Sequence, residues 1–187
     1  MDKSAESELV QRIVSGDKEE FHVVVQEYRD IIFSMIMRQV GDRTTSEELT
    51  QETFVKAYVN LKRFRGESKL GTWMTRIALN ETNNYFASRR FKEARRSESF
   101  SAETHDQVKD GDEQQEMLEK ERWLVRFRAA LATLRPLFRE VLVLCSLEGR
   151  SYEEAAQVLD IPVGTVRSRL NKARLLMREA LLQGEPG

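Results

Sequence analysis

The chain has 187 residues and a net charge of −1. Its length and its hydrophobic content of 40% are enough for one compact domain or two small ones. Its longest uncharged apolar runs, 31–37 and 141–147, are too short to cross a bilayer, and its N-terminus lacks the apolar core of a secretion signal. The single cysteine, Cys145, excludes a disulfide framework or a cysteine-based zinc site, so we expect a cytoplasmic protein.

The first half of the chain predicts three helices. Asp17 and Glu20 form a D-x-x-E start, after which apolar residues recur at helical spacing as far as Ile36. The stretch around Gly41 breaks this helix, and Thr45 with Glu48 is the expected capping box of the next one. A third helix is expected from about 70 to 84 or beyond. The apolar stripe of the second helix comprises Leu49, Thr53, Phe54, Ala57 and Leu61.

A linker and further helices are predicted in the second half. Residues from about 91 to 112 are polar, mostly acidic and aperiodic, which is typical of a flexible linker. An amphipathic stretch follows from about 113 to 131, and Pro136 fits the first turn of another helix that ends near Gly149. Strand alternation is absent from the sequence, so we expect an all-α protein with two small domains.

Residues 151–182 have the pattern of a helix-turn-helix. Ser151 and Glu154 form a capping box for a short helix, 160–164 is a tight break, and Thr165 begins a second helix. In this geometry the second helix enters the major groove, where Arg and Lys reach base edges and phosphates. The alternative is a basic surface helix without a ligand. The second helix carries the cations Arg167, Arg169, Lys172, Arg174 and Arg178 opposite its apolar stripe.

Charge is unevenly distributed along the chain. Residues 1–61 carry −5, 62–96 carry +7, 97–122 carry −6 and 123–187 carry +3. Two basic blocks separated by an acidic one indicate two sites for a polyanion, or merely two solvated faces.

The first basic block mixes cations with aromatic and amide side chains. Cations follow a phosphate backbone and aromatic faces stack bases, so this mixture is typical of proteins that bind unpaired strands. Trp73 also fits a helical stripe and is expected to pack in the core. The residues predicted to contact the strand are Phe64, Arg76, Asn80, Asn83, Asn84, Tyr85, Arg89 and Arg90.

Three stretches, taken in order, resemble sigma factors of the extracytoplasmic-function subfamily. SEELTQETFVKAY resembles their polymerase-binding helix, RFRGESKLGTWMTRIALNETNNY the stretch that follows it, and LATLRPLFREVLVLCSLEGRSYEEAAQVLDIPVGTVRSRLNKAR their second DNA-binding domain. The resemblance implies a region 2-like helical bundle over 1–92, a linker over 93–115, and a region 4-like helix-turn-helix domain over 116–187.

The resemblance also implies roles for single positions. Asn80 and the segment after it correspond to the residues that capture a flipped base of the −10 element. Docking on the clamp helices of the largest polymerase subunit falls to Glu48, Leu49, Gln51, Glu52, Phe54 and Lys56. Reading of the −35 element falls to Thr165, Arg167, Ser168, Arg169, Lys172 and Arg174.

The function implied is promoter recognition for RNA polymerase core, of a stress or envelope-response regulon, under the control of an anti-sigma factor. The flap of the second-largest subunit is a further expected partner, and neither a cofactor nor an obligate homo-oligomer is expected. The tryptophan pair with which housekeeping sigma factors open the duplex corresponds here to Arg76 and Ile77. Promoter melting is therefore expected to depend on a near-ideal promoter sequence.

Two other function classes compete with this interpretation. A transcriptional regulator would explain 151–182 but would leave the first domain without a role. An enzyme with a carboxylate metal site would use Glu48 and Glu52, four residues apart, but no Glu-x-x-His motif accompanies them. The only histidines are His22 and His105, and no phosphate-binding glycine loop is present.

The acidic linker suggests a regulatory role. It can cover a basic face, thread through a basic channel in polymerase, or act as a passive spacer. We expect two domains with no fixed separation and protease sensitivity over 97–112.

Overall fold

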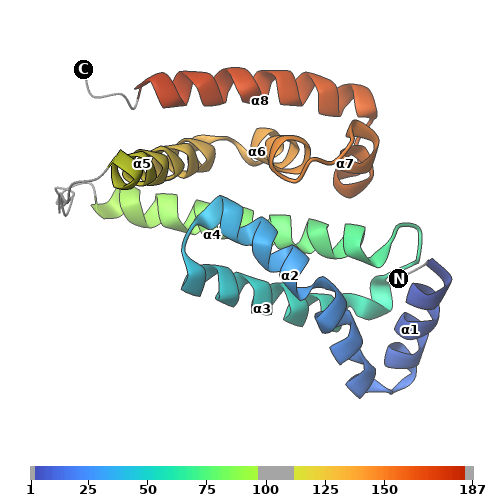
Figure 1. Cartoon of the computed structure of the whole chain (residues 1–187). Helices are drawn as coiled ribbons and strands as arrows, with labels where there is room; N and C mark the ends of the chain where they lie inside the picture. The colour runs from blue at the N-terminus through green and yellow to red at the C-terminus, as the bar shows by residue number, and fades with distance from the viewer. Residues whose placement is uncertain (1–2, 97–111, 184–187) are drawn as a thin grey trace.

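The computed structural model describes the backbone of residues 3–96 and 112–183, and the side chains of 4–89 and 116–183. The expected linker segment 97–111 lies outside the described residues. Within the described ranges every regular element is helical, which confirms the all-α prediction (Figure 1). The helices are α1 (Lys3–Ser15), α2 (Phe21–Val40), α3 (Arg43–Asn60), α4 (Leu70–Arg96), α5 (Asp112–Thr133), α6 (Pro136–Leu142), α7 (Tyr152–Leu159) and α8 (Val163–Gln183).

The first domain is built on three packed helices, α2, α3 and α4. Each contributes apolar side chains that are almost fully buried, and each of the larger ones (Leu, Ile, Met and Phe) contributes roughly 1.5–3 kcal/mol to folding. The predicted stripe of α3 is part of this core. The buried side chains include Ile32, Met35, Ile36, Leu49, Phe54, Ala57, Leu70, Met74 and Ala78.

Helix α1 was not predicted, because its apolar residues are few and its composition is polar. It buries Leu9, Val10 and Ile13. Its Glu6 is only 3% exposed and accepts hydrogen bonds from the Tyr28 hydroxyl at 2.7 Å and from the Leu70 backbone N–H at 2.9 Å. Glu6 therefore ties α1 to α2 and satisfies a free N–H at the start of α4.

The helix starts of the first domain differ from the predicted ones. The side chain of Asp17 makes no capping hydrogen bond, and a 3-10 turn at Lys18–Glu20 precedes α2. Helix α3 is capped by Asp42, whose carboxylate accepts from the Thr45 N–H at 2.8 Å, so the predicted Thr45 and Glu48 box is wrong. Asp42 is the N-cap because Gly41 ends α2 in the left-handed conformation and leaves the backbone of Asp42 extended.

The second domain comprises α5 to α8. Its predicted capping box at Ser151 and Glu154 is confirmed in both directions. Pro136 stands in the first turn of α6, as predicted, and α6 continues as a π-helical turn over Val143–Leu147. Cys145 is half-buried, and burial raises the pKa of its thiol.

The two domains lie against each other, with α4 facing α7 and α2 facing α5 (Figure 1). This differs from the expectation of no fixed separation. The reason is a set of cross-domain polar contacts, among them a two-point ion pair of Arg38 with Glu148 at 2.9 and 3.1 Å. The charge of a block of sequence could not predict this ion pair, because its two residues are 110 positions apart in the chain. No described helix is long and apolar enough to span a membrane.

Candidate nucleic-acid and protein interfaces

Helices α7 and α8 form the predicted helix-turn-helix. Asp160 ends α7 in the left-handed conformation, with φ of 55°, and α8 begins at Val163, two residues before the predicted start. The buried face of α8 consists of Val166, Leu170, Ala173 and Met177. The small Ala155 and Ala156 of α7 are buried too, which lets the two helices pack closely.

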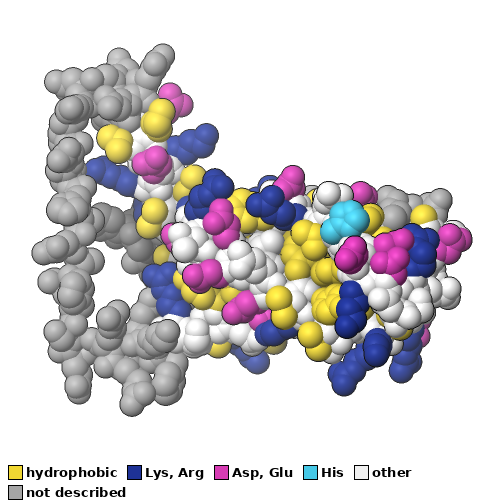
Figure 2. All heavy atoms as spheres, turned by 90° about the horizontal axis from the view of Figure 1, so that it is seen from below, with side chains coloured by type: hydrophobic (Ala, Val, Ile, Leu, Met, Phe, Trp, Pro, Cys, Tyr) yellow, Lys and Arg dark blue, Asp and Glu magenta, His cyan; other side chains and the backbone are white. Residues whose placement is uncertain are grey.

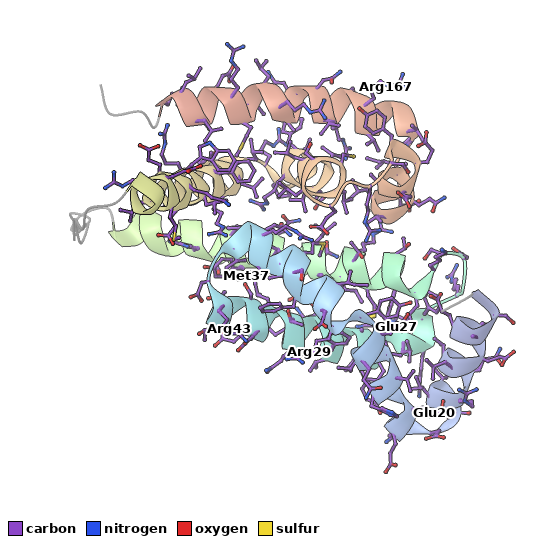
Figure 3. The ribbon with its side chains drawn as sticks, viewed as in Figure 1. Glu20, Glu27, Arg29, Met37, Arg43 and Arg167 are labelled. Atoms are coloured by element: carbon purple, nitrogen blue, oxygen red, sulfur yellow. The ribbon has the colours of Figure 1, made fainter. Side chains whose placement is uncertain are left out.

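The outward face of α8 carries exposed polar and basic side chains. Arg167, Ser168 and Lys172 are exposed, and Figure 3 shows Arg167 on the side of α8 that points away from the first domain. Asn171 is exposed in the same stretch and was missed by sequence reasoning, although an amide in a recognition helix is a base-reading group.

Three other predicted duplex contacts lie differently. Thr165 and Arg169 are partly buried, and the charge of Arg169 acts on Glu140, toward the first domain. Arg174 is exposed two turns beyond Arg167, where it lines an apolar groove with Met177. The structure therefore leaves Arg167, Ser168, Lys172 and Arg174 exposed on α8 and covers part of Thr165 and Arg169.

On α4, Arg76, Asn80 and Asn84 follow at four-residue spacing, so they lie on one face of the helix. All three are exposed. Phe64 and Trp73 pack together at one end of this face, with ring centroids 5.5 Å apart. Both are partly buried against the core, as predicted for Trp73.

The remaining single-strand candidates are divided among other positions. The Tyr85 ring is half-buried, and its centroid lies 5.4 Å from that of the Phe86 ring. The Tyr85 hydroxyl accepts a hydrogen bond from Nη1 of Arg89 at 3.4 Å. Arg89 itself is exposed. The side chain of Arg90 lies outside the described residues.

Asn83 is held by the second domain. Its Nδ2 donates to Oε1 of Glu140 at 2.5 Å, and its Oδ1 accepts from Nη2 of Arg139 at 2.6 Å. Burial raises the pKa of Glu140 above its ordinary value, and the hydrogen bond from Asn83 and the charges of Arg139, Arg169 and Arg76 oppose that rise.

The exposed face of α3 holds three of the predicted polymerase contacts, Glu48, Gln51 and Glu52. Leu49 and Phe54 must be corrected, because each is only 7% exposed and lies in the core. The apolar periodicity of the sequence, which predicted that both residues face the core, was correct here, and the family resemblance, which predicted a polymerase contact, was not. The ammonium of Lys56 binds the carboxylate of Glu81, which is buried.

Apolar residues on the outer face of α3 were missed. Val55, Tyr58 and Val59 are 62%, 37% and 69% exposed, and a search for polar contacts on α3 passed over them. Figure 2, which looks onto this side, shows apolar side chains at the surface among acidic ones. Beside them, between α2 and α3, is a hollow of about 310 Å³ lined by Arg29, Asp30, Phe33, Arg43, Glu47, Thr50 and Gln51.

An apolar groove of about 460 Å³ crosses the second domain where α8 passes α5 and α6. Its walls are almost entirely apolar, and two arginines stand at its edge. The lining residues are Phe127, Leu142, Ser146, Leu147, Arg174, Met177, Arg178, Leu181 and Leu182. Such a groove fits an apolar helix face from a partner.

In the part of the chain that the structure describes, no three His, Cys, Asp or Glu side chains gather as a metal site would require. Glu48 and Glu52 therefore have no third ligand among these residues.

Comparison with known families gives two matches in one chain. Residues 24–92 match Sigma-70 region 2, and residues 124–177 match Sigma-70, region 4. The first match contains α3 and most of α4, and the second contains the helix-turn-helix.

Relatives are similar over nearly their whole length. The ECF RNA polymerase sigma-E factor of Haemophilus influenzae is 34% identical over 180 residues, covering 92% of this chain and 93% of that protein. The RNA polymerase sigma-H factor of Pseudomonas aeruginosa is 35% identical over 184 residues, covering 94% and 93%.

Solved structures with the same fold include two complexes. CnrH in complex with the cytosolic domain of CnrY superposes with a TM-score of 0.62 at 27% identity, covering 97% of this chain and 99% of that one. The sigma factor RpoE of Bartonella quintana, in complex with the anti-sigma factor NepR, gives 0.57 at 25% identity, covering 90% and 99%.

Proposed function

This chain belongs to the extracytoplasmic-function sigma factors, and on that basis we propose that it guides RNA polymerase core to promoters through two DNA-reading helices, α4 and α8. The observation that carries the proposal is the order of its parts. Helix α3 with an exposed acid and amide face, helix α4 with an exposed Arg and Asn face, and a helix-turn-helix follow one another in a single chain.

Helix α8 reads the −35 element as duplex. Arg167, Ser168 and Lys172 make the base-edge contacts, and we add Asn171 to them because it is exposed in the same stretch. Arg169, which is partly buried, and Arg174, which lies beside the apolar groove, fit phosphate contacts, which position the helix without reading sequence.

Helix α4 reads the −10 element as an unpaired strand. Arg76, Asn80 and Asn84 supply a cation and two amides along one face, and Phe64 with Trp73 gives an aromatic edge for stacking. Arg89 and Arg90 continue the basic charge toward the end of the helix.

Helix α3 docks on the clamp helices of the largest polymerase subunit. The proposed contacts are Glu48, Gln51 and Glu52, extended by the exposed Val55 and Val59. An interface with an apolar centre and charged neighbours suits stable association better than isolated exposed carboxylates do.

The apolar groove of the second domain is the proposed seat of the flap of the second-largest subunit. Its apolar lining supports this, because a helix face with hydrophobic anchors would bury its side chains there.

We further propose that an anti-sigma factor holds this chain inactive, as the relative RpoE is bound by NepR. The domain limits proposed from sequence are 1–92 and 116–187, with 93–115 as the connection. Since the proposed partner is core polymerase, the protein acts in the cytoplasm and needs no catalytic chemistry of its own.

Run-off transcription with purified core polymerase on a promoter library tests the function. We expect initiation at a shared pair of elements only when this chain is added. A transcriptional regulator would instead bind duplex sites specifically as the isolated chain and leave initiation by core polymerase unchanged.

A further inference from the structure

A cavity of about 510 Å³ lies where α5 meets the turn between α2 and α3 and the C-terminal part of α4 (Figure 1). Its volume is in the range of pockets that hold small organic molecules. It shares no lining residue with the apolar groove of the second domain or with the proposed polymerase contacts on α3. The function proposed above therefore leaves this cavity without a role.

The lining of this cavity is mixed. Val40, Phe86 and Val125 contribute apolar side chains, one from each of α2, α4 and α5. Arg89 and Arg128 contribute guanidinium groups. Pockets for small organic molecules have this composition, in which apolar walls hold the body of the ligand and a few polar groups fix its orientation.

Arg128 passes close to the backbone of Gly41. A Cβ on Gly41 would lie 2.5 Å from Cδ and 2.6 Å from Nη1 of Arg128, so the absence of a side chain at Gly41 makes room for this arginine. Its Nε is buried, so the Nη atoms are the donors that a ligand in the cavity can reach. The arginine is thus fixed at the cavity wall by packing.

The Nε of Arg128 has no hydrogen-bond partner in the part of the chain that the structure describes. Arg126 and Arg139 also have such a Nε, but their Nη atoms donate to backbone carbonyls of the second domain. Arg128 therefore differs from its neighbours, because no carbonyl of its own domain anchors it. A cation at a cavity wall is stabilised by an anion that binds there.

The charge of the lining indicates which anion fits. Arg89 and Arg128 are the cations and Asp42 is the anion among the lining residues, which leaves a charge of +1. The Asp42 carboxylate is held at the wall as the N-cap of α3, where it accepts from the Thr45 N–H at 2.8 Å. A single negative charge balances this lining. A phosphate dianion would exceed it and would also be repelled by Asp42.

From this lining we propose that the cavity binds a small monocarboxylic acid with an apolar or aromatic body. The carboxylate pairs with Arg128, because a planar guanidinium donates two parallel hydrogen bonds to a carboxylate. The body of the acid lies against Val40, Phe86 and Val125. Both domains supply walls, so the bound acid stabilises the folded chain by linkage. The proposal does not depend on the proposed function.

The probe is para-fluorophenylacetate, and its binding to the full chain is followed by line broadening in the fluorine NMR spectrum. Physiological ionic strength screens weak attraction to exposed charges, where the screening length is about 8 Å. We expect saturable broadening with a Kd of about 0.1–1 mM, which is the affinity expected of a ligand with about eleven heavy atoms.

Arg128→Gln should weaken binding of the probe by about tenfold or more, because it removes charge-assisted hydrogen bonds to the carboxylate. Arg135→Gln is the matched control. Arg135 is an exposed cation of the same domain that lies outside the cavity and whose side chain makes no capping hydrogen bond. This variant should bind the probe as the wild type does.

Val125→Ser tests the apolar wall without a change of charge. Val125 is 64% exposed, so its replacement leaves no buried void, and the variant should fold as the wild type does. It should weaken probe binding by about threefold, because less apolar surface is covered. Thermal unfolding without the probe checks that each variant is as stable as the wild type.

Competition tests the chemical class of the ligand. Unlabelled phenylacetate should displace the probe, whereas acetate, which lacks an apolar body, and inorganic phosphate should not do so at the same concentration. Equal displacement by all three would overturn the proposal, since the cavity would then bind anions without regard to their body. Broadening that does not saturate, or equal binding by wild type and Arg128→Gln, would overturn it too. No readout uses polymerase or promoter DNA, so the result is independent of the proposed function.

Discussion

Glu6 and Leu70 are 64 residues apart in sequence, yet the carboxylate of Glu6 accepts a hydrogen bond from the backbone N–H of Leu70 at 2.9 Å. The same carboxylate accepts from the Tyr28 hydroxyl, and burial, together with this hydrogen bond, raises the pKa of Tyr28. Gly71 allows the close approach, since a Cβ there would lie 2.8 Å from the Tyr28 ring. One buried side chain thus fixes where α4 begins.

Glu6→Ala should lower the free energy of unfolding by about 2–4 kcal/mol, because it leaves a buried hydroxyl and a helix N–H without an acceptor. Glu6→Gln keeps an acceptor and should cost less. Glu8→Ala, on the exposed side of α1, should stay within about 0.5 kcal/mol. Urea unfolding measures all three, and equal losses for the two alanine variants would contradict the anchoring role of Glu6.

On α3, Glu52→Lys and the double change Val55→Ser with Val59→Ser should weaken co-purification with core polymerase without loss of helicity. The valines are 62% and 69% exposed, so their removal leaves no cavity. Leu49→Ala should act otherwise, lowering the free energy of unfolding by about 2–5 kcal/mol as a core truncation.

Glu179→Lys, an exposed charge reversal on α8, is the control for the polymerase experiment. If it weakened co-purification as much as Glu52→Lys, the effect would be one of net charge and not of the α3 face.

On α8, Arg167→Ala and Lys172→Ala should each relax preference at one or two base positions of the −35 element, by about 1–3 kcal/mol. Arg174→Ala should weaken binding similarly on all sequences, because its side chain lies beside the apolar groove, two turns beyond Arg167. Transcription from a library randomised at this element separates the two behaviours. Identical profiles for Arg167→Ala and Arg174→Ala would refute base reading by Arg167.

Glu140 should make stability depend on pH. Its pKa is raised in the folded chain, so the folded state binds this proton more readily than the unfolded state does. The resulting stabilisation is complete below the ordinary value of 4.5 and is lost as pH rises through the raised pKa. The groups that face Glu140 are Asn83, Arg139, Arg169 and Arg76.

Glu140→Gln resembles the protonated form at every pH. Its advantage over wild type in unfolding free energy should therefore grow from pH 4 to pH 7. A difference that stays constant over this range would show that the Glu140 carboxyl titrates normally.

Local signals were predictable from sequence where both partners are near in the chain. The Ser151 and Glu154 box formed as expected, since three residues separate its members. The Thr45 and Glu48 box has the same spacing but did not form. Gly41 ends α2 in the left-handed conformation, so Asp42 becomes the N-cap of α3. Which of two neighbouring residues becomes the N-cap depends on where and how the preceding helix ends. The capping pattern alone does not give this information.

Contacts between distant segments were not predictable. The role of Glu6 depends on Leu70, and the engagement of Asn83 depends on Arg139, and neither pairing has a periodic signal. For the candidate site, the exposed polar residues of α3, α4 and α8 were identified from composition and resemblance. The core positions Leu49 and Phe54 were misplaced, because resemblance marks a helix and does not mark which of its faces is covered.

Arg139 is hydrogen-bonded within its own domain as well as to Asn83 of the first domain. Its Nη1 donates to the carbonyls of Ala132 and Leu134, at 3.3 and 3.4 Å, within its own domain. The guanidinium is therefore held in place by its own domain, and little side-chain entropy is lost when it also binds Asn83. Because Asn83 and Arg139 belong to one chain, the strength of their contact does not depend on how much protein is present.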